Sequence, residues 1–148
     1  MRKIFLLCTI LIGLGVLAGC DDYQRTQVTL PDGFVIEVRL ADTPEKTTKG
    51  LMFVKHLPAD EGMLFVFDKQ DAQYFWMKNT LIDLDILFLA PDGTINQLYS
   101  RVPHTYTYTP ESEIPVVPGF GQYVLEAAAG TIERHGLKNG DKIQFTLP

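Results

Sequence analysis

The chain has 148 residues, with 13 Lys and Arg, 18 Asp and Glu, and a formal net charge of −5. Proteins that bind nucleic acid through its phosphates need clustered Lys and Arg, and this sequence contains no such cluster. Composition and charge therefore argue against nucleic acid as a partner.

The N-terminal segment has the three regions of a secretory signal peptide. Arg2 and Lys3 form a charged start, residues 4–17 are almost wholly apolar, and two small residues follow. The apolar run is short for a transmembrane helix, which needs about 20 residues. The pattern predicts an exported chain whose lipoprotein signal peptide covers residues 1–19.

The motif that ends this segment, Leu17-Ala18-Gly19-Cys20, resembles the lipobox of bacterial lipoproteins. The resemblance implies cleavage before Cys20 and attachment of several acyl chains to it, and two or more chains anchor a protein stably to a membrane. Asp21 is similar to an inner-membrane retention signal of enteric lipoproteins. We expect an extracytoplasmic protein anchored at Cys20, on the periplasmic face of the inner membrane if that sorting rule applies.

The predicted mature chain has no cysteine left for chemistry, because Cys8 leaves with the signal peptide and Cys20 carries lipid. A disulfide, a cysteine-ligated metal and a thiol nucleophile are therefore excluded. Cleavage leaves 129 residues with a formal charge of −7, enough for one compact domain. We assign residues 20–27 to the lipidated cysteine and its tether, and residues 28–148 to a single β-rich domain.

Apolar patterning predicts about eight short strands, at residues 26–30, 34–40, 63–67, 74–78, 83–89, 94–101, 123–127 and 142–147. Two Pro-Asp-Gly turns, at residues 31–33 and 91–93, mark hairpins. Short helices are expected near residues 42–50 and 130–136. A Pro-rich loop spans residues 102–119, a length that is often functional. The pattern predicts a mostly β fold, either a β-sandwich or a barrel-like domain, with one or two short helices.

The stretch from Tyr74 to Leu89 carries polar side chains inside an apolar run and contains the only Trp. Polar groups taken into a core must find hydrogen-bond partners or stay near water, so these are candidate site residues. Because side chains alternate along a strand, they could meet a carboxylate of residues 123–127 on one side of the sheet. We expect the loop at residues 102–119 to cover the resulting binding cluster, which consists of Trp76, Lys78, Asn79, Asp85 and Glu126.

Three interpretations of this cluster stay open. Two carboxylates at close range could share a proton and act as acid and base, or they could hold a hard cation such as calcium through oxygen. The structural alternative is a buried ion pair with an asparagine that fixes a turn. No catalytic residue and no cofactor is predicted, and a divalent cation is kept as an alternative.

Asp83, His104 and Tyr106 are candidates of second rank. His104 lies in the Pro-rich loop near tyrosines and glutamates, which could act as ligands or as contacts over a site. No two histidines have the spacing of a zinc site. Ser100 and Ser112 lack the context of a nucleophile elbow, so no nucleophile stands out.

Seven short motifs follow one another between Val28 and Phe145, namely Gly50-Leu51-Met52, Gly62-Met63-Leu64-Phe65, Phe75-Trp76-Met77-Lys78-Asn79-Thr80, Leu84-Asp85, Tyr123-Val124-Leu125-Glu126, Gly130 and Gly140-Asp141. In this order they resemble the uncharacterised bacterial domain-of-unknown-function family 192. The resemblance implies a compact, mostly β domain that is commonly exported or membrane-attached. It implies no reaction, because the activity of the family is not established. Lys78, Asn79, Asp85 and Glu126 match family positions.

The chain also departs from the family pattern. Asp83 stands where relatives often have Pro, which is why it is ranked second. Many relatives carry a Cys pair in the loop that here begins at His104, so no disulfide or thiol role carries over. Val54 stands where relatives often have a basic residue.

The predicted lipid anchor, the polar cluster and the absence of an evident nucleophile together indicate a membrane-anchored extracytoplasmic lipoprotein. Its domain would bind a small ligand or a partner and would not be an enzyme. One alternative is a structural or assembly partner of envelope proteins. The other is a carboxylate-based or metal-assisted hydrolase.

Overall fold

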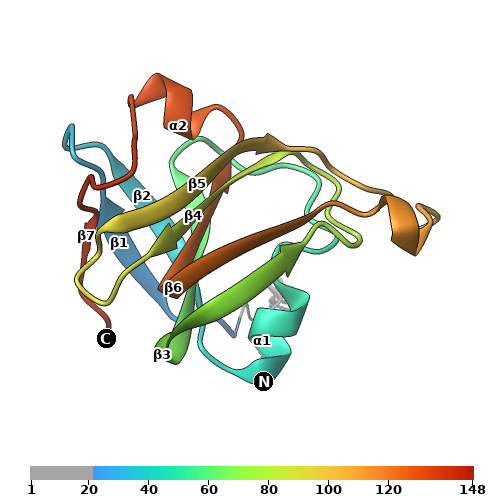
Figure 1. Cartoon of the computed structure of the whole chain (residues 1–148), viewed down its shortest axis with the longest axis horizontal. Coiled ribbons are helices and arrows are strands. Elements are labelled where there is room, and N and C mark those ends of the chain that lie inside the picture. The colour runs from blue at the N-terminus through green and yellow to red at the C-terminus, as the bar shows by residue number, and fades with distance from the viewer. Residues whose placement is uncertain (1–21) are drawn as a thin grey trace, which may run out of the picture.

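The computed structural model describes residues 22–148 as a curled sheet of seven strands with short helices at its margins (Figure 1). The strands are β1 (Arg25–Thr29), β2 (Val35–Ala41), β3 (Glu61–Trp76), β4 (Leu84–Leu89), β5 (Ile95–Val102), β6 (Val116–Ala128) and β7 (Gln144–Phe145). The helices are α1 (Pro44–Lys49), the 3-10 helix η1 (Glu111–Glu113) and α2 (Thr131–Arg134). The predicted mostly β fold with one or two short helices is confirmed, and the structure has two short α-helices.

Three predictions fall on the N-terminal segment. The signal peptide, the lipid attachment at Cys20 and the sorting residue Asp21 all lie outside the described residues. Between residues 22 and 148, no helix is both long enough and apolar enough to span a membrane. β1 begins at Arg25, so the sheet starts inside the segment that was assigned to the tether.

The strand order is β5-β4-β6-β3-β2-β1-β7, and all neighbours are antiparallel except β2 and β3. A parallel pair needs a crossover connection, and here the crossover contains α1. Curling brings the two sheet edges together, where an isolated bridge pairs Thr94 with Lys142. The backbone N–H of Ile95 also donates to the C=O of Asp141 at 2.8 Å. The sheet is therefore a curled half-barrel rather than two stacked layers.

Both Pro-Asp-Gly segments form the expected hairpin turns. The side chains of Asp32 and Asp92 each accept a hydrogen bond from the backbone N–H two residues later, at 3.1 Å in both turns. Gly33 and Gly93 have φ angles of 88° and 85°, in the left-handed region that glycine adopts without a steric penalty. The local turn chemistry alone sets these two connections.

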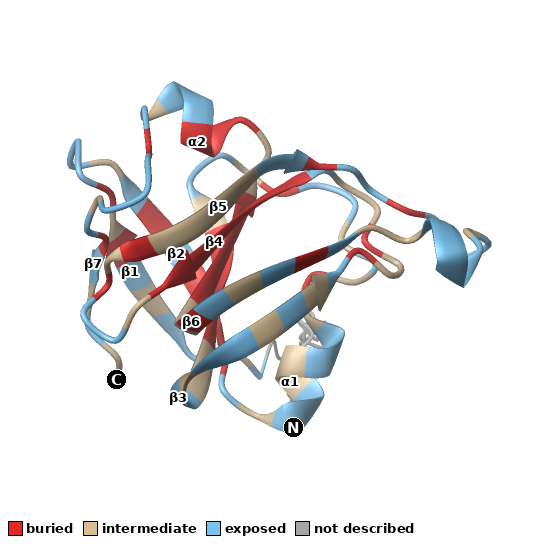
Figure 2. Cartoon of the chain, viewed as in Figure 1, coloured by how far each residue is buried: buried red, intermediate tan, exposed pale blue. Residues whose placement is uncertain are grey.

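The core lies on both faces of the sheet. All six residues of β4 are buried, because β5 and β6 flank this strand and both of its faces are covered (Figure 2). Leu87 packs with Leu64 and Leu125 in one apolar cluster. Phe88 packs with Phe65 in the other. A strand buried on both faces appears in the sequence as a continuous apolar run, which is how β4 reads.

Two boundaries differ from the prediction. The strands expected at residues 63–67 and 74–78 are parts of one strand, β3, and the polar residues between them form a register shift instead of a turn. β6 starts at Val116, inside the predicted loop. β4 pairs with β6 from Tyr123 onward, which leaves a free edge at Pro118. A strand edge accommodates proline because no N–H is needed there.

Candidate functional site

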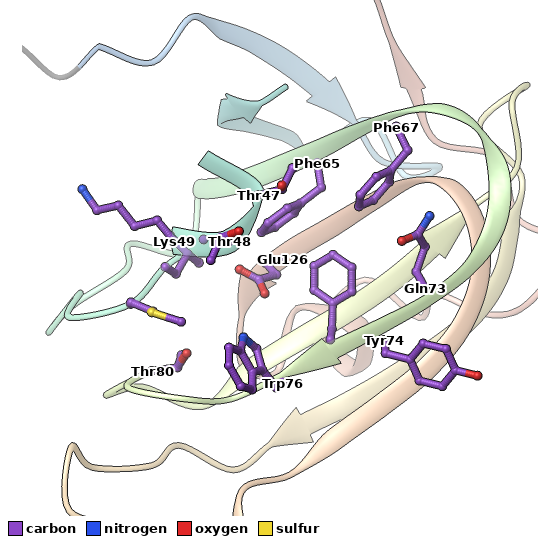
Figure 3. Close-up of a pocket in the computed structure, with 14 residues that line it drawn as sticks. Thr47, Thr48, Lys49, Phe65, Phe67, Gln73, Tyr74, Trp76, Thr80 and Glu126 are labelled. Atoms are coloured by element: carbon purple, nitrogen blue, oxygen red, sulfur yellow. The ribbon is translucent and has the colours of Figure 1, made fainter. Parts of the chain in front are cut away.

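A pocket of about 250 Å³ opens between α1, the loop that follows it, and the strands β3 and β6 (Figure 3). Its apolar lining residues include Phe65, Phe75, Leu51 and Trp76. Glu126 projects into the cavity from β6 (Figure 3). No residue of the predicted cover at 102–119 lines this pocket. The cover is instead the C-terminal end of α1.

The sequence at α1 explains how this helix approaches the sheet so closely. Thr43 caps the helix by accepting a hydrogen bond from the N–H of Lys46 at 3.3 Å, and Pro44 occupies the first turn. The helix ends at Gly50, whose φ is 46°. A Cβ there would lie 3.2 Å from Cζ of Phe65 and 3.8 Å from Oε2 of Glu126. Glycine therefore leaves open the space directly beside the Glu126 carboxyl.

Glu126 is a buried acid without a partner. Its exposed fraction is 5%, and its Oε2 atom is buried with no hydrogen-bond partner among the described residues. Burial raises the pKa of Glu126 to about 8, since removal from water disfavours the charged form. At neutral pH this side chain is therefore mainly an uncharged carboxylic acid.

One other described side-chain atom shares this condition, Nε2 of His135. That histidine is nevertheless engaged, because its Nδ1 lies 2.7 Å from Asp32 Oδ2 and its ring contacts Phe34 at 4.4 Å between centroids. Glu126 has no comparable contact, and it lines a cavity. A buried polar group without a partner calls for a functional or structural explanation, and an acid with a perturbed pKa in a pocket is a candidate site.

Aromatic rings surround the acid. Phe65 and Phe75 meet edge to face with centroids 4.7 Å apart, and Phe67 contacts Phe75 at 6.4 Å. Trp76 is 44% exposed. The ammonium of Lys78 lies 4.9 Å from the Trp76 ring centroid. These rings form the apolar part of the wall beside Glu126, and Thr47, Thr48, Gln73 and Thr80 add polar side chains to the lining.

Lys78 belongs to the rim of the site and not to its interior. Its Nζ atom forms a salt bridge with Oε1 of Glu111 at 2.7 Å, and neither side chain lines the pocket. The side chain of Lys49 does line the pocket, but it extends away from Glu126 (Figure 3). No described cation therefore neutralises the buried acid.

The predicted convergence of Lys78, Asp85 and Glu126 on one side of the sheet is wrong for Asp85. In the β4–β6 register, Asp85 faces Ala127, whereas Glu126 faces Ile86. Directly paired residues of antiparallel strands point to the same face, so the two carboxylates project to opposite faces. A shift of one residue in pairing would have reversed this arrangement.

Asp85 has a structural role. It is fully buried and accepts two backbone hydrogen bonds, from Arg101 N–H at 2.8 Å and from Ile132 N–H at 2.7 Å. These bonds join the end of β5 and the start of α2 to β4. Asn79 likewise serves the backbone, because it adopts a φ of 55° and its C=O accepts the N–H of Phe53 at 2.9 Å.

The second-rank residues form a separate surface cluster. Asp83 Oδ1 lies 2.6 Å from His104 Nδ1, and His104 Nε2 lies 3.1 Å from the Tyr106 hydroxyl. The hydrogen bond from the backbone N–H of His104 holds the pKa of the Asp83 carboxyl below its usual range, and the hydrogen bond with the His104 ring adds to this effect. Tyr106 stacks on Tyr108 with centroids 5.3 Å apart. None of these residues lines the Glu126 pocket.

Metal binding has little geometric support in residues 22–148, where no three His, Cys, Asp or Glu side chains gather as a ligand set.

The walls of the pocket were not predicted from the sequence. The motifs Gly50-Leu51-Met52 and Gly62-Met63-Leu64-Phe65 could have indicated them, since they supply Leu51 and Phe65. Within one sequence, they look the same as ordinary core residues after a turn.

This chain is similar to known proteins over most of its length. The profile of the DUF192 family, described as "Uncharacterized ACR", matches residues 27–145. A solved structure from Sinorhizobium meliloti 1021, of a protein proposed to be a transcription regulator, is 34% identical with a TM-score of 0.70, over 83% of this chain and 95% of that chain. A protein of unknown function from Novosphingobium aromaticivorans DSM 12444 is 33% identical with a TM-score of 0.69, over 82% of this chain and 84% of that chain. No curated protein matches.

Proposed function

Since this chain belongs to the DUF192 family, which is described only as uncharacterised, we propose a function from the geometry of its pocket. In this proposal the chain is a membrane-anchored extracytoplasmic protein that binds a small molecule at Glu126. The observation that carries this proposal is the buried Oε2 atom of Glu126, which has no partner among the described residues and borders a cavity of about 250 Å³. A ligand in that cavity would supply the missing hydrogen bond.

Anchoring is supported by the lipobox-like sequence that ends at Cys20. β1 starts at Arg25, five residues later. Five extended residues span roughly 15–18 Å, so the domain would stay close to the bilayer. A tethered binding protein meets its ligand at the membrane surface.

Binding is favoured over hydrolysis by the composition of the pocket. Glu126 is the one carboxylate among the described lining residues, and no Ser, Cys or His lines the cavity. Acid–base hydrolysis with two carboxylates needs a second acid nearby, and Asp85 projects to the opposite face of the sheet. The hydrolase alternative therefore lacks its second group.

The similar protein from Sinorhizobium meliloti is described as a proposed transcription regulator. We propose no DNA partner here, because a formal net charge of −5 without a basic cluster disfavours phosphate binding.

Native mass spectrometry of the full chain, extracted from membranes in mild detergent, tests the binding proposal. We expect an additional mass on the wild type, its loss in Glu126→Gln, and its retention in the exposed control Asp68→Asn. A mass removed by a chelator would identify a metal and not an organic ligand. A bare wild-type mass, together with no thermal shift from any compound of a fragment library, would contradict the proposal.

An assembly role is the second candidate, because one surface favours it. Tyr74, Val116 and Phe120 are 73%, 54% and 51% exposed, and they lie on the paired strands β3 and β6. Exposed apolar patches often mark protein contacts. Replacing Tyr74 and Phe120 by Ser should abolish a crosslinked partner in cells if this surface assembles, and should leave the crosslinking pattern unchanged if it does not.

A further inference from the structure

We infer that the Glu126 pocket takes a small organic cation, namely a primary ammonium group carried on an apolar body. This inference rests on the proposed function, because it names the ligand class for the same pocket.

The charges around the pocket are distributed in a way that favours a cation. From β6 the acid Glu126 projects into the cavity, and from α1 Lys49 reaches only its edge (Figure 3). β3 contributes Tyr74, which is 73% exposed, and no charged residue. Asp85 of the neighbouring strand β4 is directed to the other face. The interior therefore holds one acidic group and no basic group.

Aromatic walls strengthen the preference. Phe65, Phe75 and Trp76 line the cavity, and the faces of such rings attract cations. Trp76 already receives the ammonium of Lys78 at 4.9 Å, which shows that its ring is accessible to a positive charge. An anionic ligand would meet these ring faces and a chain of formal charge −5, both of which oppose it.

An ammonium group also satisfies Glu126 better than a neutral group does. It donates N–H hydrogen bonds to the unpartnered Oε2 atom and supplies the counter-charge that the protein lacks there. Hydrogen bonds between charged partners are roughly twice as strong as neutral ones. Because burial raises the pKa of Glu126 to about 8, ionising it at pH 7 reduces apparent affinity only about tenfold.

The size of the cavity limits the body of the ligand. At about 250 Å³ it is smaller than the pockets of drug-sized ligands, which measure about 300–1,000 Å³. A single ring or a short branched chain fits this space. Benzylammonium is therefore a suitable probe, and benzyl alcohol and benzoate are matched probes with a neutral and an anionic end.

Calorimetric titration of the full chain with these three probes at pH 6, 7 and 8 tests the inference. We expect benzylammonium to bind most tightly, with affinity rising about tenfold between pH 6 and pH 7 and levelling off above pH 8, because binding requires loss of the Glu126 proton. Buffers of different ionisation enthalpy should reveal about one proton released per ligand at pH 6. Glu126→Gln should remove the pH dependence and weaken benzylammonium binding at least tenfold, whereas Asp68→Asn, at an exposed position outside the pocket, should not weaken it.

Two other results would overturn the inference, and only the first of them is compatible with the proposed small-molecule pocket. Tighter binding of benzyl alcohol or benzoate, with wild-type affinity that does not rise with pH, would reject the ammonium and keep a small-molecule pocket. Failure of all three probes and of the fragment library to bind would reject the proposed function as well. The wild-type pH slope needs no variant, so it decides the matter even if Glu126→Gln folds poorly.

Discussion

Two buried acids on neighbouring strands differ in the hydrogen bonds that they accept. Asp85 receives two backbone N–H groups at 2.8 and 2.7 Å. Glu126 lies one strand away, and its Oε2 atom receives none from the described residues. Burial of a charge is tolerated when hydrogen bonds replace water, so Asp85 stabilises the fold. Glu126 destabilises it unless a proton or a ligand compensates.

The stability of the protein should therefore depend on pH through Glu126. Burial raises its pKa from 4.5 to about 8, so between these values the folded state keeps a proton that the unfolded chain has lost. The free energy of unfolding consequently decreases as pH rises from 4.5 through 8. One pKa unit corresponds to about 1.4 kcal/mol, which gives a penalty that grows by about 3 kcal/mol between pH 5 and pH 8.

Glu126→Gln removes this titration. We expect the variant to gain about 3 kcal/mol of stability relative to the wild type between pH 5 and pH 8, as measured by urea denaturation at both values. If the free energy of unfolding changes with pH by the same amount in both proteins, Glu126 is not protonated in the folded state between pH 5 and pH 8.

Asp85→Asn should have the opposite consequence. Asparagine keeps one acceptor oxygen but turns an NH₂ group toward a backbone N–H, so we expect a loss of about 2–4 kcal/mol, since hydrogen bonds to charged groups contribute about 1.5–3 kcal/mol each. Asp68→Asn, at an exposed position, should change stability by less than about 0.5 kcal/mol. Urea unfolding at pH 7 checks both, and equal effects would contradict the structural role of Asp85.

At the scale of elements, the β3–β6 ribbon depends on close packing against β4. Gly119 of β6 is flanked by the ring of Phe88, and a Cβ at this glycine would overlap that ring. Phe88 belongs to the apolar cluster on the pocket side of the sheet and contacts Phe75 at 5.7 Å. The absence of a side chain at Gly119 therefore positions a ring that supports the pocket wall.

Gly119→Ala should destabilise the fold by about 1–3 kcal/mol, the usual cost of overpacking a core. Adding Phe88→Leu should recover part of this loss, because the smaller side chain leaves space for the new methyl group. The double-mutant cycle is measured by urea denaturation. Additive effects of the two substitutions would show that the Phe88 ring is not the obstacle.

At the scale of the whole molecule, the half-barrel and its proposed anchor are joined by a short segment. Metabolic labelling with a fatty-acid analogue should mark the wild-type chain and the control variant Cys8→Ser, which loses only a residue of the predicted signal peptide. Cys20→Ser should lose the label completely, since its hydroxyl replaces the thiol that would carry lipid. Label on Cys20→Ser, or none on the wild type, would contradict the anchor.

Local patterns in the sequence predicted much of the architecture. The alternation of residues 34–40 and the two Pro-Asp-Gly turns depend on neighbouring residues alone, and the structure contains a strand and both hairpins there. The polar residues at 68–71 resemble a turn for the same local reason. They lie within β3 because its pairing with β6 is interrupted after Val66 but resumes at Asp71, and that pairing partner is about fifty residues away.

The amino-acid sequence by itself therefore determined the mostly β class, the turns and which residues of one strand share a face. Tertiary structure decided which strand faces meet. The β4–β6 register separated Asp85 from Glu126, and the crossover after β2 brought α1 and Gly50 beside Glu126. The physical reason is that side-chain alternation is a property of a single strand, whereas register and crossover depend on contacts between segments far apart in the chain.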